Sequence, residues 1–144
     1  MESITQTLSH DHSRCDKLFA QAEASVAQKQ WERSATDFAD FRAAMERHFS
    51  MEEQVLFPTF EARTGQMGGP TQVMRMEHEQ MRSVFAEMQE SVNEKNSEQY
   101  LGLSETLLIL MQQHNAKEEQ MLYPMTDQVL SHEVPSVIEQ MGSL

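Results

Sequence analysis

The sequence predicts an all-α fold: an antiparallel up-down four-helix bundle with a pseudo-two-fold internal repeat and a short C-terminal helix. Apolar residues recur at helical spacing in four long segments, the connections between these segments are short, and no segment shows the alternating period of a strand. The 144 residues suit a single domain, residues 1–144, which is large enough to bury a core without disulfides.

Local signals place the first two helices. The first should run from about residue 3 to 28. The second should begin near Trp31 and end or kink around Pro58, because a proline inside a helix removes a backbone hydrogen bond. Gly65 suits the exit of the chain from this helix.

The clearest loop, residues 64–70, separates the two halves of the chain. Pro70 suits the first turn of the third helix. A polar break follows at residues 93–97, with Ser97 as the N-cap of a fourth helix that continues to Pro124. A short tail helix is expected after Pro135.

The chain also contains an internal repeat with an offset of 66 residues, which aligns residues 48–58 with residues 114–124 without a gap. The same offset matches residues of the first helix to residues of the third: Asp11 to Glu77, His12 to His78, Phe19 to Phe85 and Ala20 to Ala86. Two helical hairpins related by a pseudo-two-fold axis explain this pattern.

Each of the four helices carries one histidine within its apolar stripe: His12, His48, His78 and His114. At about 3.6 residues per turn, these positions lie on the core-facing sides. A single histidine on an apolar face is usually a satisfied core residue. Four histidines related by one offset are instead typical of a shared ligand set.

Two glutamates extend the pattern. Glu52 and Glu118 each follow a histidine by four residues, which places them only about 40° away around the helix. Glu53 and Glu119 lie about 140° away and are expected on the outer side, not as ligands. A buried carboxylate costs several kcal/mol unless it is paired or binds a metal, so metal ions are the expected partners.

The sequence resembles the hemerythrin-like, or HHE cation-binding, domains. The resemblance extends from about Leu8 to Leu130 and depends on four motifs in order: Asp11-His12, His48-xxx-Glu52, Glu77-His78 and His114-xxx-Glu118. It implies a non-haem di-iron centre in which both glutamates bridge the metals. One iron would take His12 and His48, and the other His78 and His114. Mn or Zn are possible in place of iron, and an oxo or hydroxo bridge is expected.

The chain departs from oxygen-carrying hemerythrins at Met74, where those proteins have a fifth histidine one turn before the third-helix ligand. They also place the last carboxylate at i+5, as an aspartate. The four-His, two-Glu set is more similar to the iron-cluster-repair and iron-sensing branches of the family.

The remaining candidates are weaker. Cys15 lies three residues after His12 and could approach the metals, although such a cysteine is more often a small buried apolar residue. His10 should face away from the core, and His132 should lie on the surface. Tyr123, which the repeat matches to Phe57, is expected to serve only in packing.

Composition narrows the function. The net charge of −12 makes nucleic acids and anionic membranes poor partners. The chain lacks an apolar run of membrane-spanning length and a signal-peptide pattern, so we expect it in the cytoplasm.

Three functions remain open. The protein could bind or sense O2 or NO, or hold iron. It could be a di-iron enzyme or iron donor that acts on peroxide, NO or damaged clusters, or it could be a metal-free structural bundle. The first is favoured, with a diatomic molecule or peroxide as the ligand.

Overall fold

The computed structural model describes residues 2–144, and within this range the chain is helical, without strands. In chain order the α-helices are α1 (Ile4–Ala27), α2 (Trp31–Ser50), α3 (Phe57–Thr64), α4 (Pro70–Asn93), α5 (Ser97–Lys117), α6 (Tyr123–Val129) and α7 (Val134–Gly142). Two π-helical segments, η1 (Met51–Leu56) and η2 (Glu118–Leu122), join α2 to α3 and α5 to α6.

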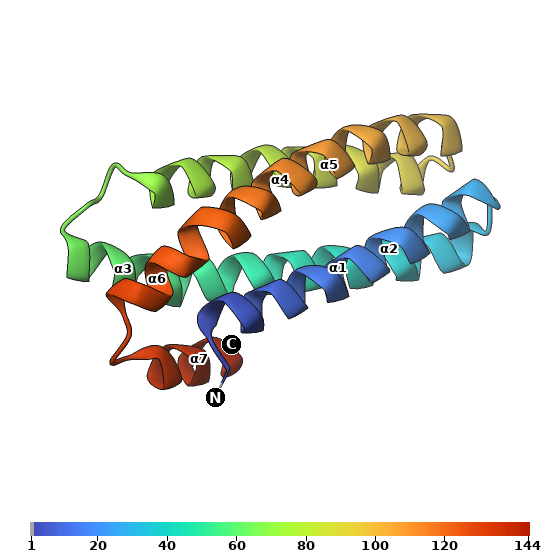
Figure 1. The fold of residues 1–144 in the computed structure, drawn as a ribbon. Coiled ribbons are helices and arrows are strands. Elements are labelled where there is room, and N and C mark those ends of the chain that lie inside the picture. Colours follow the sequence, from blue (N-terminus) through green and yellow to red (C-terminus); the bar gives the residue numbers. More distant parts are fainter. Residues whose placement is uncertain (1) are drawn as a thin grey trace.

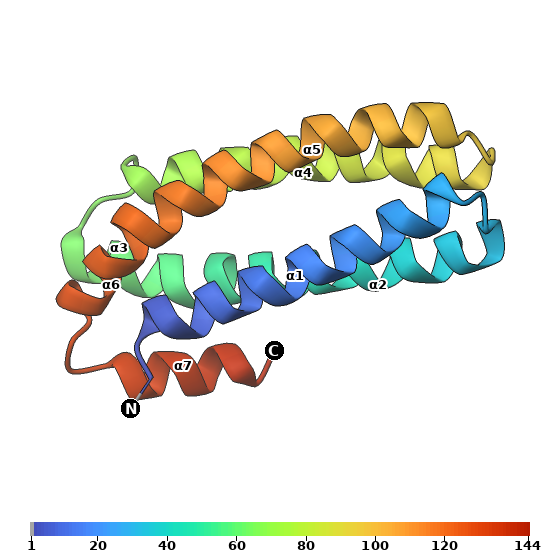
Figure 2. The same cartoon turned by 45° about the vertical axis from the view of Figure 1, so that its right-hand side comes forward.

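The long helices form an antiparallel four-helix bundle, which confirms the predicted fold class. Helices α1 and α2 make one hairpin, and α4 and α5 make the other (Figure 1). The hairpins pack through α1 against α5 and through α2 against α4, so each long helix has two long neighbours. A second view shows the two hairpins as two layers, with α7 lying beside the start of α1 (Figure 2).

The helix ends agree with the local signals, with one correction. Ser3 caps α1 by accepting a hydrogen bond from the backbone N–H of Gln6. Gly65 ends α3 with a φ of 71°, a left-handed conformation that costs glycine little. The N-cap of α5 is Asn96, not Ser97, because the Asn96 side chain accepts the hydrogen bond from the Gln99 N–H.

The helices that carry the repeat continue through their prolines. The backbone N–H of Phe57 bonds to the carbonyl of Glu52, five residues earlier, and that of Tyr123 bonds to the carbonyl of Glu118. A proline ring in a regular α-helix clashes with the carbonyl four residues before it. The wider π-turn displaces that carbonyl, so the helix passes Pro58 without ending there.

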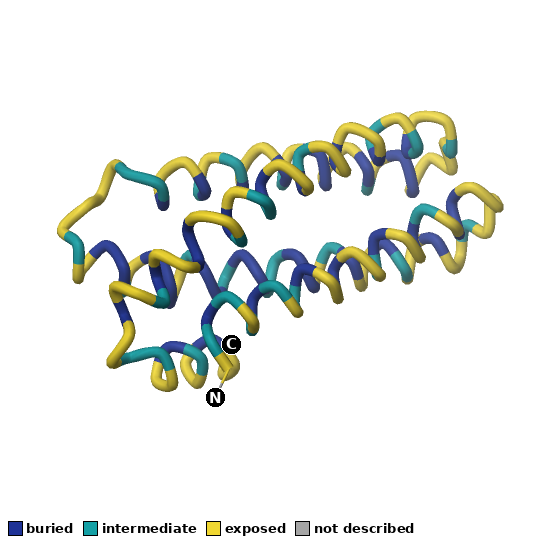
Figure 3. Tube along the Cα trace, viewed as in Figure 1, coloured by how far each residue is buried: buried dark blue, intermediate teal, exposed yellow. Residues whose placement is uncertain are grey.

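Two apolar clusters fill the bundle. One lies toward the α1–α2 and α4–α5 turns, and the other lies toward α3, α6 and α7. The buried positions follow the inner faces of the long helices (Figure 3). Met121 lies at helical spacing from His114 and Glu118 and would be expected on the inner face, but it is 64% exposed. Its repeat counterpart, Val55, is buried because α7 packs against η1.

Candidate metal centre

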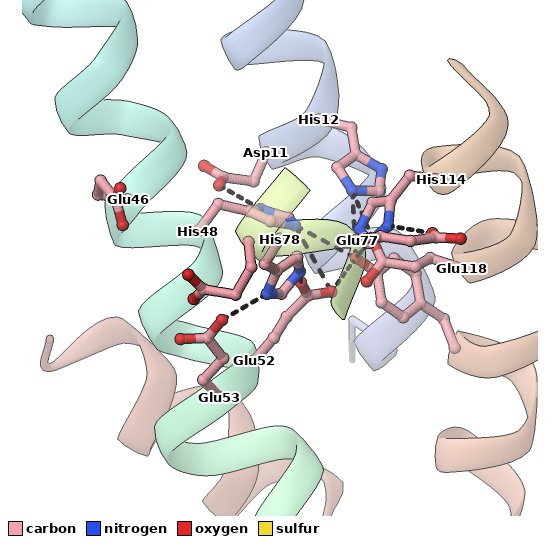
Figure 4. A network of polar contacts seen from close by, with 12 residues as sticks. Asp11, His12, Glu46, His48, Glu52, Glu53, Glu77, His78, His114 and Glu118 are labelled. Atoms are coloured by element: carbon pink, nitrogen blue, oxygen red, sulfur yellow. Dashed lines mark hydrogen bonds and ion pairs between the residues drawn. The ribbon is translucent and has the colours of Figure 1, made fainter. Parts of the chain in front are cut away.

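The four predicted histidines meet between the two apolar clusters. Each comes from a different long helix, and each is buried: His12 on α1, His48 on α2, His78 on α4 and His114 on α5. Glu52 is the second residue of η1 and Glu118 the first of η2, and both are completely buried among the histidines (Figure 4).

The imidazole Nε2 atoms point toward the two carboxylates. Nε2 of His78 lies 3.0 Å from Oε1 of Glu52, and Nε2 of His48 lies 3.7 Å from the other oxygen of that carboxylate. Nε2 of His12 and Nε2 of His114 lie 3.1 and 3.2 Å from Oε1 of Glu118. Each glutamate therefore approaches one histidine from each hairpin.

The potential ligand atoms fall into two groups, each spanning less than 4.8 Å: Glu52, His78, His114 and Glu118 in one, and His12, His48 and Glu118 in the other. The two groups share Glu118. The imidazole rings pair in the same way, with centroids 4.5 Å apart for His12 and His48 and 5.0 Å apart for His78 and His114. The structure thus brings all six predicted residues together, and each group is large enough to hold one metal ion.

A ring of acidic side chains surrounds the histidines. Nδ1 of His48 lies 2.7 Å from Asp11, and Nδ1 of His114 lies 2.8 Å from Glu77. These two contacts are equivalent under the repeat, and each lies within one hairpin. When Nδ1 carries the proton and donates it outward, Nε2 is left with its lone pair facing inward, as a metal ligand requires.

The other two outer contacts join the hairpins. Nδ1 of His78 lies 2.6 Å from Glu53, and Nδ1 of His12 lies 2.6 Å from Glu119. The sequence prediction placed both glutamates on the outer side without a function. In the structure neither belongs to a group of potential ligand atoms, yet both hold a histidine ring. The π-turn accounts for this, since its extra residue per turn brings position i+5 closer to the inner face.

The partners of Glu53 decide the charge state of this outer carboxylate. Burial raises the pKa of the Glu53 carboxyl, but hydrogen bonds from His78 and Arg82 outweigh burial and lower this pKa to about 2. Arg82 also bonds to Glu46 and Glu79, so the positive charge beside His78 is itself held in place. The outer carboxylate of His78 is therefore ionised at neutral pH.

For the inner histidines and Glu52 as well, the charged partners outweigh burial, and the pKa values shift toward the charged forms. Burial lowers the pKa of His48, but the Glu52 carboxylate and the Asp11 hydrogen bond outweigh it and raise this pKa to about 10. For His114, burial is again outweighed, here by Glu118 and then Glu52, and the pKa rises to about 9. Burial raises the pKa of Glu52, but His48 and further hydrogen bonds hold it well below its usual range. In the absence of metal, protons on His48 and His114 thus balance the charge of the buried Glu52 carboxylate.

Tyr123 is a site residue that the sequence prediction assigned only to packing. Its hydroxyl lies 2.6 Å from Oε2 of Glu52 and 2.8 Å from Oε1 of Glu118. Nε2 of His12 and Nε2 of His48 lie 3.2 and 3.3 Å from the same oxygen. The repeat could have indicated that Tyr123 has a function of its own, because it matches this tyrosine to a phenylalanine, Phe57, in the other half.

The donor set fits a metal ion. Within residues 2–144, four buried side-chain atoms at the cluster make no hydrogen bond, although Nε2 of His78 and Nε2 of His114 each lie close to a carboxylate oxygen: Oε1 of Glu52, Nε2 of His78, Nε2 of His114 and Oε2 of Glu118. Such atoms are costly unless something else binds them. A divalent cation coordinated by imidazole and carboxylate would satisfy all four.

The weaker candidates lie outside this cluster. Cys15 is buried among Phe19 and other apolar side chains, and burial raises the pKa of its thiol to about 12, which disfavours the thiolate that binds metal. Met74 packs in the second apolar cluster. His10 and His132 are exposed, as expected.

An all-helical bundle with a buried cluster of histidines and glutamates defines a class of metal-binding helical proteins. A family model described as the hemerythrin HHE cation-binding domain matches residues 3–126, so this chain belongs to that family. Family membership implies a metal-binding bundle, and the cluster fits a metal site. Searches of curated proteins and of solved structures found no match. No helix within residues 2–144 is long and apolar enough to cross a membrane.

Proposed function

We propose that this protein holds two iron ions in the bundle and binds or senses a small ligand there, either O2 or NO. His12 and His48 would hold one ion and His78 and His114 the other, and Glu52 and Glu118 would supply carboxylate ligands. The observation that carries the proposal is the division of the ligand atoms into two groups that share Glu118.

The surrounding residues support this assignment. Each histidine has an outer carboxylate within 2.8 Å of Nδ1, which fixes the ring with Nε2 inward. Such outer carboxylates also make an imidazole a better donor to a metal. Bound ferrous ions would supply open coordination positions and electrons to a small ligand. The two apolar clusters on either side would keep bulk water away.

An enzyme or an iron donor is the second candidate. The Tyr123 hydroxyl favours it, since this group offers a proton donor beside four of the proposed ligands. Burial and the two glutamates raise the pKa of Tyr123 well above its usual value, so the phenol keeps its proton. Peroxide and NO are the substrates that such a site would take. A metal-free structural bundle is the third possibility.

Anaerobic reconstitution with ferrous iron tests the assignment. Wild-type protein should approach two irons per chain, and His12→Gln should hold less. His10→Gln is the matched control, because His10 lies on the same helix but is exposed, and it should hold as much iron as wild type. One iron per chain in the wild type would refute the two-metal proposal.

Titration of the reduced, iron-loaded protein then separates the functions. Reversible spectral changes with O2 or NO would support a binding protein. Continuous consumption of peroxide or NO would support the enzyme, and transfer of iron to an acceptor would support the donor. Protein that takes up no metal under these conditions would be a structural bundle.

A further inference from the structure

An apolar groove lies between the start of α4 and the η2–α6 segment, on the surface of the second hairpin. Its volume is about 370 Å³, and Lys117 is among the residues that line it. Three of its side chains are substantially exposed: Val73 at 46%, Met121 at 64% and Met125 at 38%. Its apolar walls are formed by Pro70, Val73, Met74, Met121, Leu122 and Met125.

The internal repeat relates this groove to a surface that is already occupied. The offset of 66 residues matches Pro70, Met74, Met121 and Leu122 to Ile4, Leu8, Val55 and Leu56. Those four residues of the first half are buried in one apolar cluster with Val137 and Met141 of α7. Helix α7 contacts α1 and η1, which correspond to α4 and η2. Four of the six apolar residues of the groove therefore have counterparts in the seat of α7, while Val73 and Met125 correspond to Thr7 and Thr59.

The structure thus contains one filled and one open version of the same helix-binding surface. We propose that the open groove binds an amphipathic helix of another protein, with an apolar face like that of α7. In α7 this face consists of Val134, Val137, Ile138 and Met141, spaced at i, i+3, i+4 and i+7. This spacing is the one by which a helix fills a groove.

The α7 helix of a second copy is a poorer occupant than a separate helix. Each α7 already buries its apolar face in its own chain, and its departure would uncover Ile4 and Val55. The ends of the two surfaces also differ. Arg63 forms an ion pair with Glu133 at the start of α7, and Arg47 bonds to the carbonyls of Gly142 and Leu144 at its end.

The open groove lacks both arginines. The repeat matches Arg63 to Val129, which is exposed, and Arg47 to Gln113. The helix that fits the open groove should consequently carry an apolar residue where α7 has Glu133. This difference distinguishes the partner helix from α7 itself, and the inference does not depend on the metal ions.

A helix-stapled peptide with the sequence of residues 133–142 and the change Glu133→Leu is a suitable probe. We expect it to bind the full-length protein and to shift the amide NMR signals of Val73, Met121 and Met125. Met121→Glu should weaken binding at least tenfold. Met76→Glu is the matched control, because Met76 is also exposed on α4 but does not line the groove, and it should leave binding unchanged.

Four outcomes would overturn the proposal. The first is no binding of the stapled peptide, and the second is equal binding to Met121→Glu. The third is a shift of the signals of Ile4 and Val55, which would mean that the peptide displaces α7. The fourth is a concentration-dependent dimer in sedimentation that Met121→Glu abolishes, which would assign the groove to a second copy of the chain.

Discussion

The hydroxyl oxygen of Tyr123 lies 2.6 Å from Oε2 of Glu52, and this contact joins the second hairpin to the first at the centre of the site. The same oxygen lies 2.8 Å from Glu118. Phe57, the repeat counterpart of Tyr123, stacks near His78 without a hydroxyl. The Tyr123 hydroxyl is thus one difference between the two halves of a nearly symmetric centre, and Asp11 in place of Glu77 is another.

Tyr123→Phe should destabilise the metal-free protein. The substitution keeps the ring but removes a hydrogen bond to a buried carboxylate, at a cost of about 1–3 kcal/mol. Thermal unfolding of the metal-free protein should show a lower Tm. Tyr100→Phe is the control, because Tyr100 is also buried but lies in the first apolar cluster. An equal effect of both substitutions would mean that the Tyr123 hydroxyl adds nothing.

Glu53→Ala should weaken metal binding without removing a proposed ligand. Glu53 holds Nδ1 of His78, and loss of such an outer carboxylate costs about 10–100-fold in metal affinity. Competition with a chelator of known affinity measures the change. Glu46→Ala provides the control, since Glu46 also pairs with Arg82 but makes no hydrogen bond to a histidine. Comparable affinities for the two variants would refute a positioning function for Glu53.

Metal uptake at pH 7 should release protons. The raised pKa values of His48, about 10, and His114, about 9, keep both imidazoles protonated in the metal-free protein. A metal ion requires the neutral ring. Binding in weak buffer with a pH indicator should therefore acidify the solution, and affinity should increase as the pH rises from 7 to 9. A pH-independent affinity would contradict this prediction.

The same pKa shifts predict how the metal-free protein responds to alkali. Both histidines have pKa values raised above the unfolded value of about 6.5, so the folded state binds more protons between that pH and about 10. Their stabilising contribution is complete below pH 6.5 and is lost as the pH rises through 9 to 10. The Tm of the metal-free protein should fall across this window. A Tm that stays constant from pH 7 to 10 would show that the two imidazoles are not held in their charged form.

Removal of metal should loosen the bundle. A metal that binds only the folded state adds about 2.7 kcal/mol to its stability at 100 times Kd. The proposed ligands come from all four long helices, so the metal would link both hairpins. Calorimetry before and after chelation should show a lower Tm without metal. Superimposable transitions would mean that the ligand set contributes no structural link.

The sequence by itself determined the helices and the six residues that converge. Helical periodicity and end signals are local, so the four long helices could be located without knowledge of their packing. The repeat then indicated that His12, His48, His78 and His114 share one setting. The spacing of four residues selected Glu52 and Glu118 for the inner face, where the structure buries them.

Only the tertiary structure decided how these residues meet. Spacing along one helix does not say which side chain of a neighbouring helix it faces, so the outer carboxylates at Glu53 and Glu119 were missed. The π-turns before the prolines change the direction of side chains at η1 and η2 in a way that a uniform 100° rotation per residue does not describe. Two further differences arise from packing between elements distant in sequence: the Tyr123 hydroxyl reaches Glu52 across the bundle, and α7 covers Val55 but leaves Met121 open.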